Sequence, residues 1–236
     1  MFSLSELLHF LLSPKYAAFE RKSTHIPSTT FKIYLLLILF TGLIGVLCTS
    51  ILPSSFSLPV DTTFEIPDRY KENLWGFFLL VAFIGPLVEE ILFRLSLVFD
   101  PLNIALSGST MLYLVFRIFS NRLISLVSFF LLLIILFRIA VMYKSEITSF
   151  WDKNFKYIFY FLALSFGLLH ISNYRYSENT QYLIAPILVL PQIAMGLVLS
   201  FTRVYYKKGF LIGIFTHILT NLITISIFLL HSSGNT

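Results

Sequence analysis

Long apolar runs separated by short polar segments dominate the pattern along the chain. Each run has about twenty residues, the length that an α-helix needs to cross a hydrocarbon core of about 30 Å. Seven spans are expected, at 31–52, 74–98, 102–119, 123–143, 157–171, 182–202 and 209–230. The pattern predicts an all-α fold, a polytopic transmembrane helical bundle of about seven spans, within a range of six to eight.

Two features refine this pattern. Pro186 and Pro191 fall inside the sixth expected span, and they predict a break there because proline lacks the backbone N–H of a continuous helix. Before the first span, the apolar residues of segment 1–14 predict a short helix in the membrane interface. We therefore divide the chain into an N-terminal cytoplasmic or interfacial segment, residues 1–30, and an integral membrane domain, residues 31–236.

Composition agrees with the pattern. Of the 236 residues, 57% are hydrophobic and 12% are charged, whereas soluble domains average about 25% charged residues. This composition excludes an ordinary soluble domain, a disordered chain and a disulfide scaffold. The single cysteine, Cys48, lies inside an apolar run and is expected to be a buried small hydrophobe.

The net charge of +5 carries information about topology. The basic residues lie between apolar runs, so we expect contacts with membrane lipids and no nucleic-acid partner. They concentrate in the N-terminal segment and in the loops after the fourth and sixth spans. These residues are Lys15, Arg21, Lys22, Lys32, Lys144, Lys153, Lys156, Arg203, Lys207 and Lys208. The positive-inside rule then places the N-terminus in the cytoplasm and the C-terminus outside.

Two adjacent acids lie inside the second span, in the segment Gly85-Pro-Leu-Val-Glu-Glu-Ile-Leu-Phe-Arg94. A carboxylate at a helix centre costs about 2.5–3.5 kcal/mol on insertion scales, so such residues usually have a function. Glu90 and Arg94 have the i,i+4 spacing of a helical ion pair. Glu89 points about 100° away around the helix, free for another task. Pro86 is expected to free the carbonyl of Ala82 and to kink the helix beside a hydrated cavity.

Polar residues in two later spans are the other candidates. His170 ends the sequence Phe166-Gly-Leu-Leu-His170, and His217 and Asn221 lie one turn apart on the last span. Each feature has a plain structural interpretation: a buried ion pair that aids packing, an interfacial histidine, or a histidine that donates between helices. None of these interpretations explains Glu89.

Together these residue types suit peptide hydrolysis. A buried carboxylate can act as a general base at neutral pH, and an imidazole can orient the attacking water. Histidine and asparagine side chains can donate to the oxyanion of the tetrahedral intermediate. Alternatively, two imidazoles, a carboxylate and a water make a common catalytic zinc set, here Glu89, His170 and His217.

In order along the chain, the three motifs resemble those of the CPBP family of intramembrane proteases, which includes CAAX-processing enzymes and bacteriocin-processing or immunity proteins. The matching segments are Glu89-Glu90-Ile-Leu-Phe-Arg94, Phe166–His170 and His217–Asn221, and the resemblance covers residues 80–230. The chain departs from the family in having Leu95 where glycine is usual and about two additional spans before the second motif.

The resemblance implies roles for the candidate residues. Glu89 is the expected general base, His170 helps to activate the water, and His217 and Asn221 form the oxyanion hole. Glu90 and Arg94 are expected to fix the site. The resemblance favours a metal-free glutamate mechanism without a cofactor, with Zn²⁺ as the alternative. The expected substrate is a membrane-associated peptide or a lipidated protein, and the expected location is a bacterial cell membrane.

Two other classes of function remain open at the level of sequence. In a proton- or ion-coupled transporter, Glu89 and His170 would relay protons, and the broken sixth span has parallels in carriers. In a non-catalytic immunity or scaffold protein, the same motifs would serve only the structure. The sequence leaves the identity of the substrate and the oligomeric state open.

Overall fold

The computed structural model describes residues 2–16, 21–51, 58–62 and 65–233. The predicted end of the first span at Leu52, and parts of the predicted segment 1–30, lie outside these residues. Among these described residues, six helices are long and apolar enough to cross a membrane: Ile26–Cys48, Leu74–Leu97, Pro101–Phe119, Arg122–Met142, Lys144–Asn173 and Gly209–Leu229. The chain is a multi-pass integral membrane protein with an all-α bundle, as predicted.

The main helices are α1 (Leu4–Leu12), α2 (Ile26–Ile51), α3 (Leu74–Leu79), α4 (Gly85–Phe93), α5 (Pro101–Phe119), α6 (Arg122–Met142), α7 (Lys144–Leu169), α8 (Ala185–Leu188), α9 (Leu190–Tyr205) and α10 (Gly209–Ser233). A π-helical segment, η3 (Leu80–Ile84), joins α3 to α4. The 3-10 segments are η2 (Asp68–Tyr70), η4 (Leu95–Leu97), η5 (His170–Asn173) and η6 (Asn179–Leu183).

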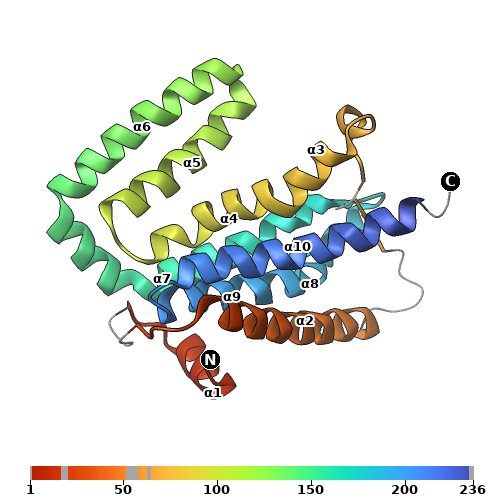
Figure 1. Ribbon diagram of the computed structural model, residues 1–236, viewed down its shortest axis with the longest axis horizontal. Coiled ribbons are helices and arrows are strands. Elements are labelled where there is room, and N and C mark those ends of the chain that lie inside the picture. The colour runs from red at the N-terminus through yellow and green to blue at the C-terminus, as the bar shows by residue number, and fades with distance from the viewer. Residues whose placement is uncertain (1, 17–20, 52–57, 63–64, 234–236) are drawn as a thin grey trace.

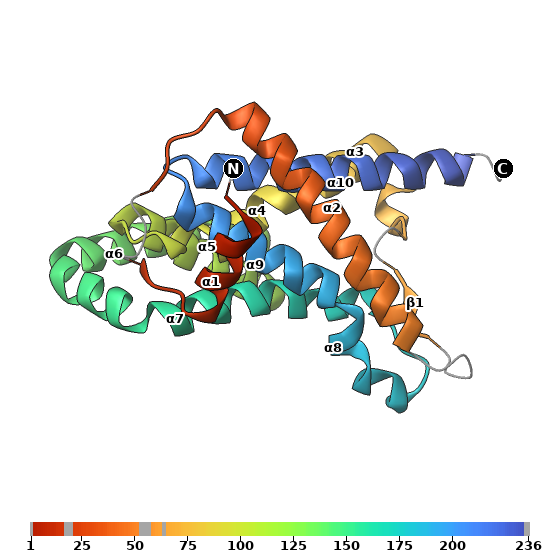
Figure 2. The ribbon, with the colours of Figure 1, turned by 90° about the horizontal axis from the view of Figure 1, so that it is seen from below.

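Five helices form the body of the bundle. α10 packs against α2, α4 and α9, and α9 also packs against α2 and α7 (Figures 1 and 2). α5 and α6 make an antiparallel hairpin to one side of this body, where α5 packs against α4 (Figure 1). Inside the body, aromatic side chains such as Phe155, Phe159 and Phe201 are fully buried. The helices that carry the three motifs, α4, α7 and α10, therefore belong to one packed unit.

Small residues set the contact between α7 and α9. A Cβ atom at Gly167 of α7 would lie 2.7 Å from the backbone nitrogen of Ile193, and Gly196 of α9 packs against the carbonyl oxygen of Ala163. Glycine lets helix backbones approach this closely, as in other membrane bundles. The two contacts hold the start of α9 against the end of α7.

The predicted break in the sixth span is confirmed. Pro186 and Pro191 occupy the first turns of α8 and α9, where a missing N–H is tolerated, and Val189 separates the two helices. With 16 residues, α9 is too short to be among the six spanning helices.

Three expected boundaries were wrong. The first spanning helix begins at Ile26 instead of Phe31. The fifth helix begins at Lys144 instead of Tyr157. Its first half is polar, so the apolar pattern marks only its second half. Arg203, expected in a loop, lies in the last turn of α9 with only 6% of its surface exposed.

Helix α1 has the predicted helical form, with a capping box between Ser3 and Glu6 at its start. It packs against α9 with Leu7 and Phe10 buried, while Leu4, Leu8 and Leu12 remain exposed. Its apolar residues therefore divide between two faces.

A polar cluster ties the N-terminal segment to the bundle. Glu6 accepts hydrogen bonds from Lys22 Nζ at 2.9 Å and from Tyr205 Oη at 2.7 Å. The backbone N–H of Lys22 donates to the carbonyl oxygen of Tyr205, at the end of α9. The segment is thus fastened to the same helix end that carries Arg203.

One feature of the connections was not predicted. Strands β1 (Val60–Asp61) and β2 (Tyr174–Arg175) pair antiparallel. Beside them, Thr62 donates from both its backbone N–H and its hydroxyl to the carbonyl oxygen of Asn173. These bonds fix the loop before α3 to the chain that follows His170.

Candidate active site

Helix α4 and its C-cap supply the first three predicted residues. Glu90 and Arg94 are fully buried, and Nη1 of Arg94 lies 3.4 Å from Oε1 of Glu90. This confirms the ion pair that the i,i+4 spacing predicts. Glu89 points to a different side of the helix, and 34% of its side chain is exposed. The two adjacent acids therefore have different surroundings.

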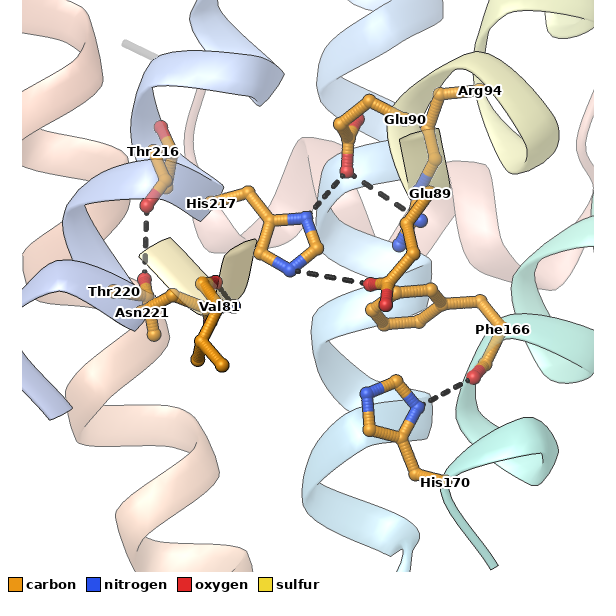
Figure 3. Close-up of polar contacts among 10 residues, drawn as sticks. All are labelled: Val81, Glu89, Glu90, Arg94, Phe166, His170, Thr216, His217, Thr220 and Asn221. Carbon is orange, nitrogen blue, oxygen red and sulfur yellow. Dashed lines mark hydrogen bonds and ion pairs between the residues drawn. The ribbon is translucent and has the colours of Figure 1, made fainter. Parts of the chain in front are cut away.

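His217 lies between the two carboxylates. Its Nδ1 is 3.0 Å from Oε1 of Glu90, and its Nε2 is 3.5 Å from Oε2 of Glu89 (Figure 3). Gly213, one turn earlier on α10, makes room for this arrangement, since a Cβ atom there would lie 3.0 Å from Oε2 of Glu90. The third motif thus joins the first motif directly.

Phe166 connects the second motif to the other two. Its ring centre lies 3.7 Å from the guanidinium carbon of Arg94, a cation–π contact. The same ring meets His170 and His217 edge to face, with centroid distances of 4.9 and 5.7 Å. Phe166 therefore packs against a member of every motif (Figure 3).

His170 is held by its own helix. It is the C-cap of α7, and its Nδ1 lies 2.8 Å from the carbonyl oxygen of Phe166. Because a carbonyl oxygen only accepts, this contact assigns the proton to Nδ1 and leaves Nε2 of a neutral ring as an acceptor. Such a nitrogen can accept a hydrogen bond from a water molecule.

Asn221 supplies a hydrogen-bond donor that the backbone before α4 lacks. In η3 the bonds run from residue i to i−5, as from the Gly85 N–H to the carbonyl oxygen of Leu80. The next donor in this register would be Pro86, which has no N–H, so Val81 loses its partner. Nδ2 of Asn221 donates to that oxygen at 3.0 Å.

This contact corrects an expectation. The carbonyl that receives the replacement donor is that of Val81, one residue before the expected Ala82, because the π-helical turn shifts the register by one. The side-chain amide of Asn221 has two N–H groups, so one remains for another acceptor.

One cavity of about 420 Å³ lies among these residues. Glu89, His170, His217 and Asn221 all line it. The remaining lining residues are Thr41, Leu80, Val81, Gly85, Asn173, Pro191, Gln192, Met195, Thr220 and Thr224. Glu90 and Arg94 do not line it, and they support His217 and Phe166 from behind. Four of the six predicted residues therefore meet at one cavity, while Glu90 contacts His217 and Arg94 contacts Phe166 outside it.

Two residues of this region were missed at the level of sequence. Arg203 donates from Nε to the carbonyl oxygen of Arg94 and from Nη2 to that of Leu95, each at 3.2 Å. Gln192 lines the cavity from the first turn of α9. In both cases the signal in the sequence is a polar residue within an apolar run; Arg203 is counted there among the loop charges, and Gln192 has no predicted role.

The zinc alternative can be tested against the side chains. Within the described part of the chain, no three His, Cys, Asp or Glu residues come together as a metal-binding group. The bond from Nδ1 of His170 to a backbone oxygen leaves its Nε2 free, as in many metal-binding histidines. The expected zinc set fails because its three side chains do not come together as a ligand group in the described residues. We derive no step through a metal.

Comparison with known proteins finds no match to this chain among protein-family models, curated proteins or solved structures. The resemblance of the three motifs to CPBP proteases therefore stays a prediction.

Proposed function

We propose that the chain is an intramembrane endopeptidase of the CPBP type, which hydrolyses a peptide bond in a membrane-associated or lipidated substrate. The observation that carries this proposal is the convergence of Glu89, His170, His217 and Asn221 on one cavity. Attack by a water molecule requires a general base, and stabilisation of the oxyanion requires hydrogen-bond donors. An acid, two imidazoles and an amide can supply both. Glu89 is partly exposed at the cavity, so it can contact a bound molecule as well as His217.

In the proposed reaction, a water molecule lies between Glu89 and Nε2 of His170. Glu89 takes one proton from the water while the oxygen of the water bonds to the carbonyl carbon of the substrate. The tetrahedral intermediate then breaks the C–N bond, and Glu89 returns the proton to the leaving amine. The products are a carboxylic acid and an amine, and Glu89 ends as it began.

The oxyanion of the intermediate needs hydrogen-bond donors near Glu89. The second N–H of Asn221 and Nε2–H of His217, when that nitrogen is protonated, are the proposed donors. Glu90 fixes the orientation of His217 through Nδ1, and Arg94 supports both Glu90 and the ring of Phe166. Glu90 and Arg94 are thus positioning residues in this proposal.

Topology follows from the distribution of basic residues. We propose that the N-terminus faces the cytoplasm of a bacterial cell, which places Lys22, Lys207 and Lys208 on the cytoplasmic side. In this orientation, a peptide anchored in the membrane would reach the side chains that line the cavity.

A pair of matched strains tests the proposal. One produces the protein as it is and the other produces Glu89→Gln, which keeps the size of the side chain but cannot take a proton. Glu72→Gln, which changes an exposed acid on a loop, is the control. Peptide termini enriched only in cells with an intact Glu89 are the expected result of a proteomic comparison.

The purified protein in liposomes provides the second half of the test. Fluorogenic apolar peptides, with and without a farnesylated C-terminal cysteine, serve as probes. Glu89→Gln should reduce cleavage at least about a hundredfold, the lower end of general acid–base contributions, at an unchanged melting temperature. Equal cleavage by the parent protein and Glu89→Gln would contradict the proposed function.

A further inference from the structure

Gln192 is a polar residue at the cavity with no task in the reaction described above. It belongs to the first turn of α9, directly after the break at Val189 and beside Pro191. It lines the same cavity as Glu89 and His170. A glutamine at this place needs an explanation, because its neighbours in the sequence are apolar.

The hydrogen bonds of the cavity residues set Gln192 apart. The hydroxyl groups of Thr41, Thr220 and Thr224 donate to carbonyl oxygens of their own helices. By contrast, Oε1 of Gln192 is buried and has no hydrogen-bond partner among the described residues. Buried polar groups are almost always satisfied, so an acceptor without a protein partner at a cavity is free to bind a water molecule or a ligand there.

The packing of α7 against α9 fixes the position of this side chain. Gly167 contacts the backbone of Ile193, the residue that follows Gln192. His170 lies one turn after Gly167, at the C-cap of α7. The contact therefore holds Gln192 in a defined place relative to His170, as a residue that binds substrate requires.

We infer that Gln192 binds the main chain of the substrate peptide next to the bond that is cut. A primary amide matches a peptide group, since its oxygen accepts from an N–H while its NH₂ donates to a carbonyl. Most of the surface that lines the cavity is apolar, so Gln192 is one of the few groups there that can pair with the main chain of a peptide. The inference rests on the proposed function and adds how the proposed active site binds the substrate.

The test compares two substitutions on the same helix. Gln192→Met keeps the length of the side chain and removes its hydrogen bonds. Ser200→Ala is the matched control, because Oγ of Ser200 is also buried and without a partner, but Ser200 does not line the cavity. Both variants are assayed in liposomes with a fluorogenic apolar peptide that the parent protein cleaves.

We expect Gln192→Met to raise KM about tenfold, the size of one or two lost hydrogen bonds, with kcat within about twofold of the parent value. Ser200→Ala should change neither constant. The affinity of the same peptide for Glu89→Gln should fall by a similar factor when Gln192→Met is added. Gln192→Leu repeats the measurement with a second side chain in case the Met variant does not fold.

The outcomes separate this inference from the proposed function. If Glu89→Gln is inactive while Gln192→Met keeps the parent KM, Gln192 does not bind substrate and the protease assignment stands. A fall in kcat at constant KM also overturns the inference. If Glu89→Gln cleaves as the parent does, both proposals fall together.

Discussion

His217 and Glu90 lie 127 residues apart in the chain, yet Nδ1 of one is 3.0 Å from Oε1 of the other. Both side chains are almost completely buried, and Arg94 contacts the same carboxylate oxygen. Three ionisable groups from two helices thus share one oxygen inside the bundle. The contribution of each charged group to the stability of the fold can be tested by substitution.

Removal of the carboxylate of Glu90 should destabilise the fold strongly. Glu90→Ala leaves the buried guanidinium of Arg94 without a counter-charge, which typically costs about 3–5 kcal/mol. The melting temperature of the purified protein in detergent is the measurement, with Glu72→Ala as a control at an exposed acid. Glu90→Leu combined with Arg94→Leu should recover much of the loss, and a double variant as unstable as Glu90→Ala alone would contradict this explanation.

The close contact at Gly167 should not tolerate a methyl group. Gly167→Ala would press a Cβ atom against the backbone of Ile193, and overpacking of this kind costs about 1–3 kcal/mol. Gly42→Ala on α2 is the matched control, because no atom lies within 4 Å of a Cβ atom there. Thermal unfolding should separate the two variants clearly. Equal melting temperatures would mean that α7 and α9 can move apart freely.

Arg203 should matter for stability although it lies outside the cavity. Arg203→Met removes a donor from the carbonyl oxygens of Arg94 and Leu95. The oxygen of Arg94 keeps the N–H of Leu97, so the expected cost is that of one unsatisfied buried group, about 1–3 kcal/mol. Arg203→Lys should restore only part of this, since one ammonium does not reproduce the geometry of a guanidinium. Lys208→Met, at an exposed position of the next turn, should leave the melting temperature unchanged.

The docking of the N-terminal segment should weaken in acid. The backbone N–H of Ser3, with help from Lys22 and Tyr205, lowers the pKa of Glu6 from 4.5 to about 2. Because the pKa is lower in the folded state, the contribution to stability is complete above about pH 4.5 and is lost as the pH falls toward about 2. Hydrogen exchange of the α1 amides, corrected for the intrinsic rate, should therefore show less protection at pH 3.5 than at pH 7.

Glu6→Gln is the control for this pH dependence. The variant should show the weaker protection of α1 at both pH values, because no proton binds at this position. If the parent protein and Glu6→Gln respond to acid in the same way, another group is responsible.

Most of the helices could be predicted because the length of the apolar runs determines them directly. The ion pair of Glu90 and Arg94 also follows from local spacing, and its prediction was confirmed. The register of the π-helical turn could not be predicted, since it depends on where Asn221 of a distant helix supplies a donor to Val81. Arg203 was misplaced for a similar reason: its partners are backbone oxygens on another helix, which leave no mark in the sequence.

The hairpin of α5 and α6 leaves the body of the bundle and returns to it beside α7 (Figure 1). Such an excursion adds no net crossing, so every later helix keeps its orientation whether the hairpin is there or not. A chain that lacked the hairpin could therefore place Glu89, His170 and His217 in the same relation. A search for related proteins is better based on the spacing within each motif than on the distance between motifs.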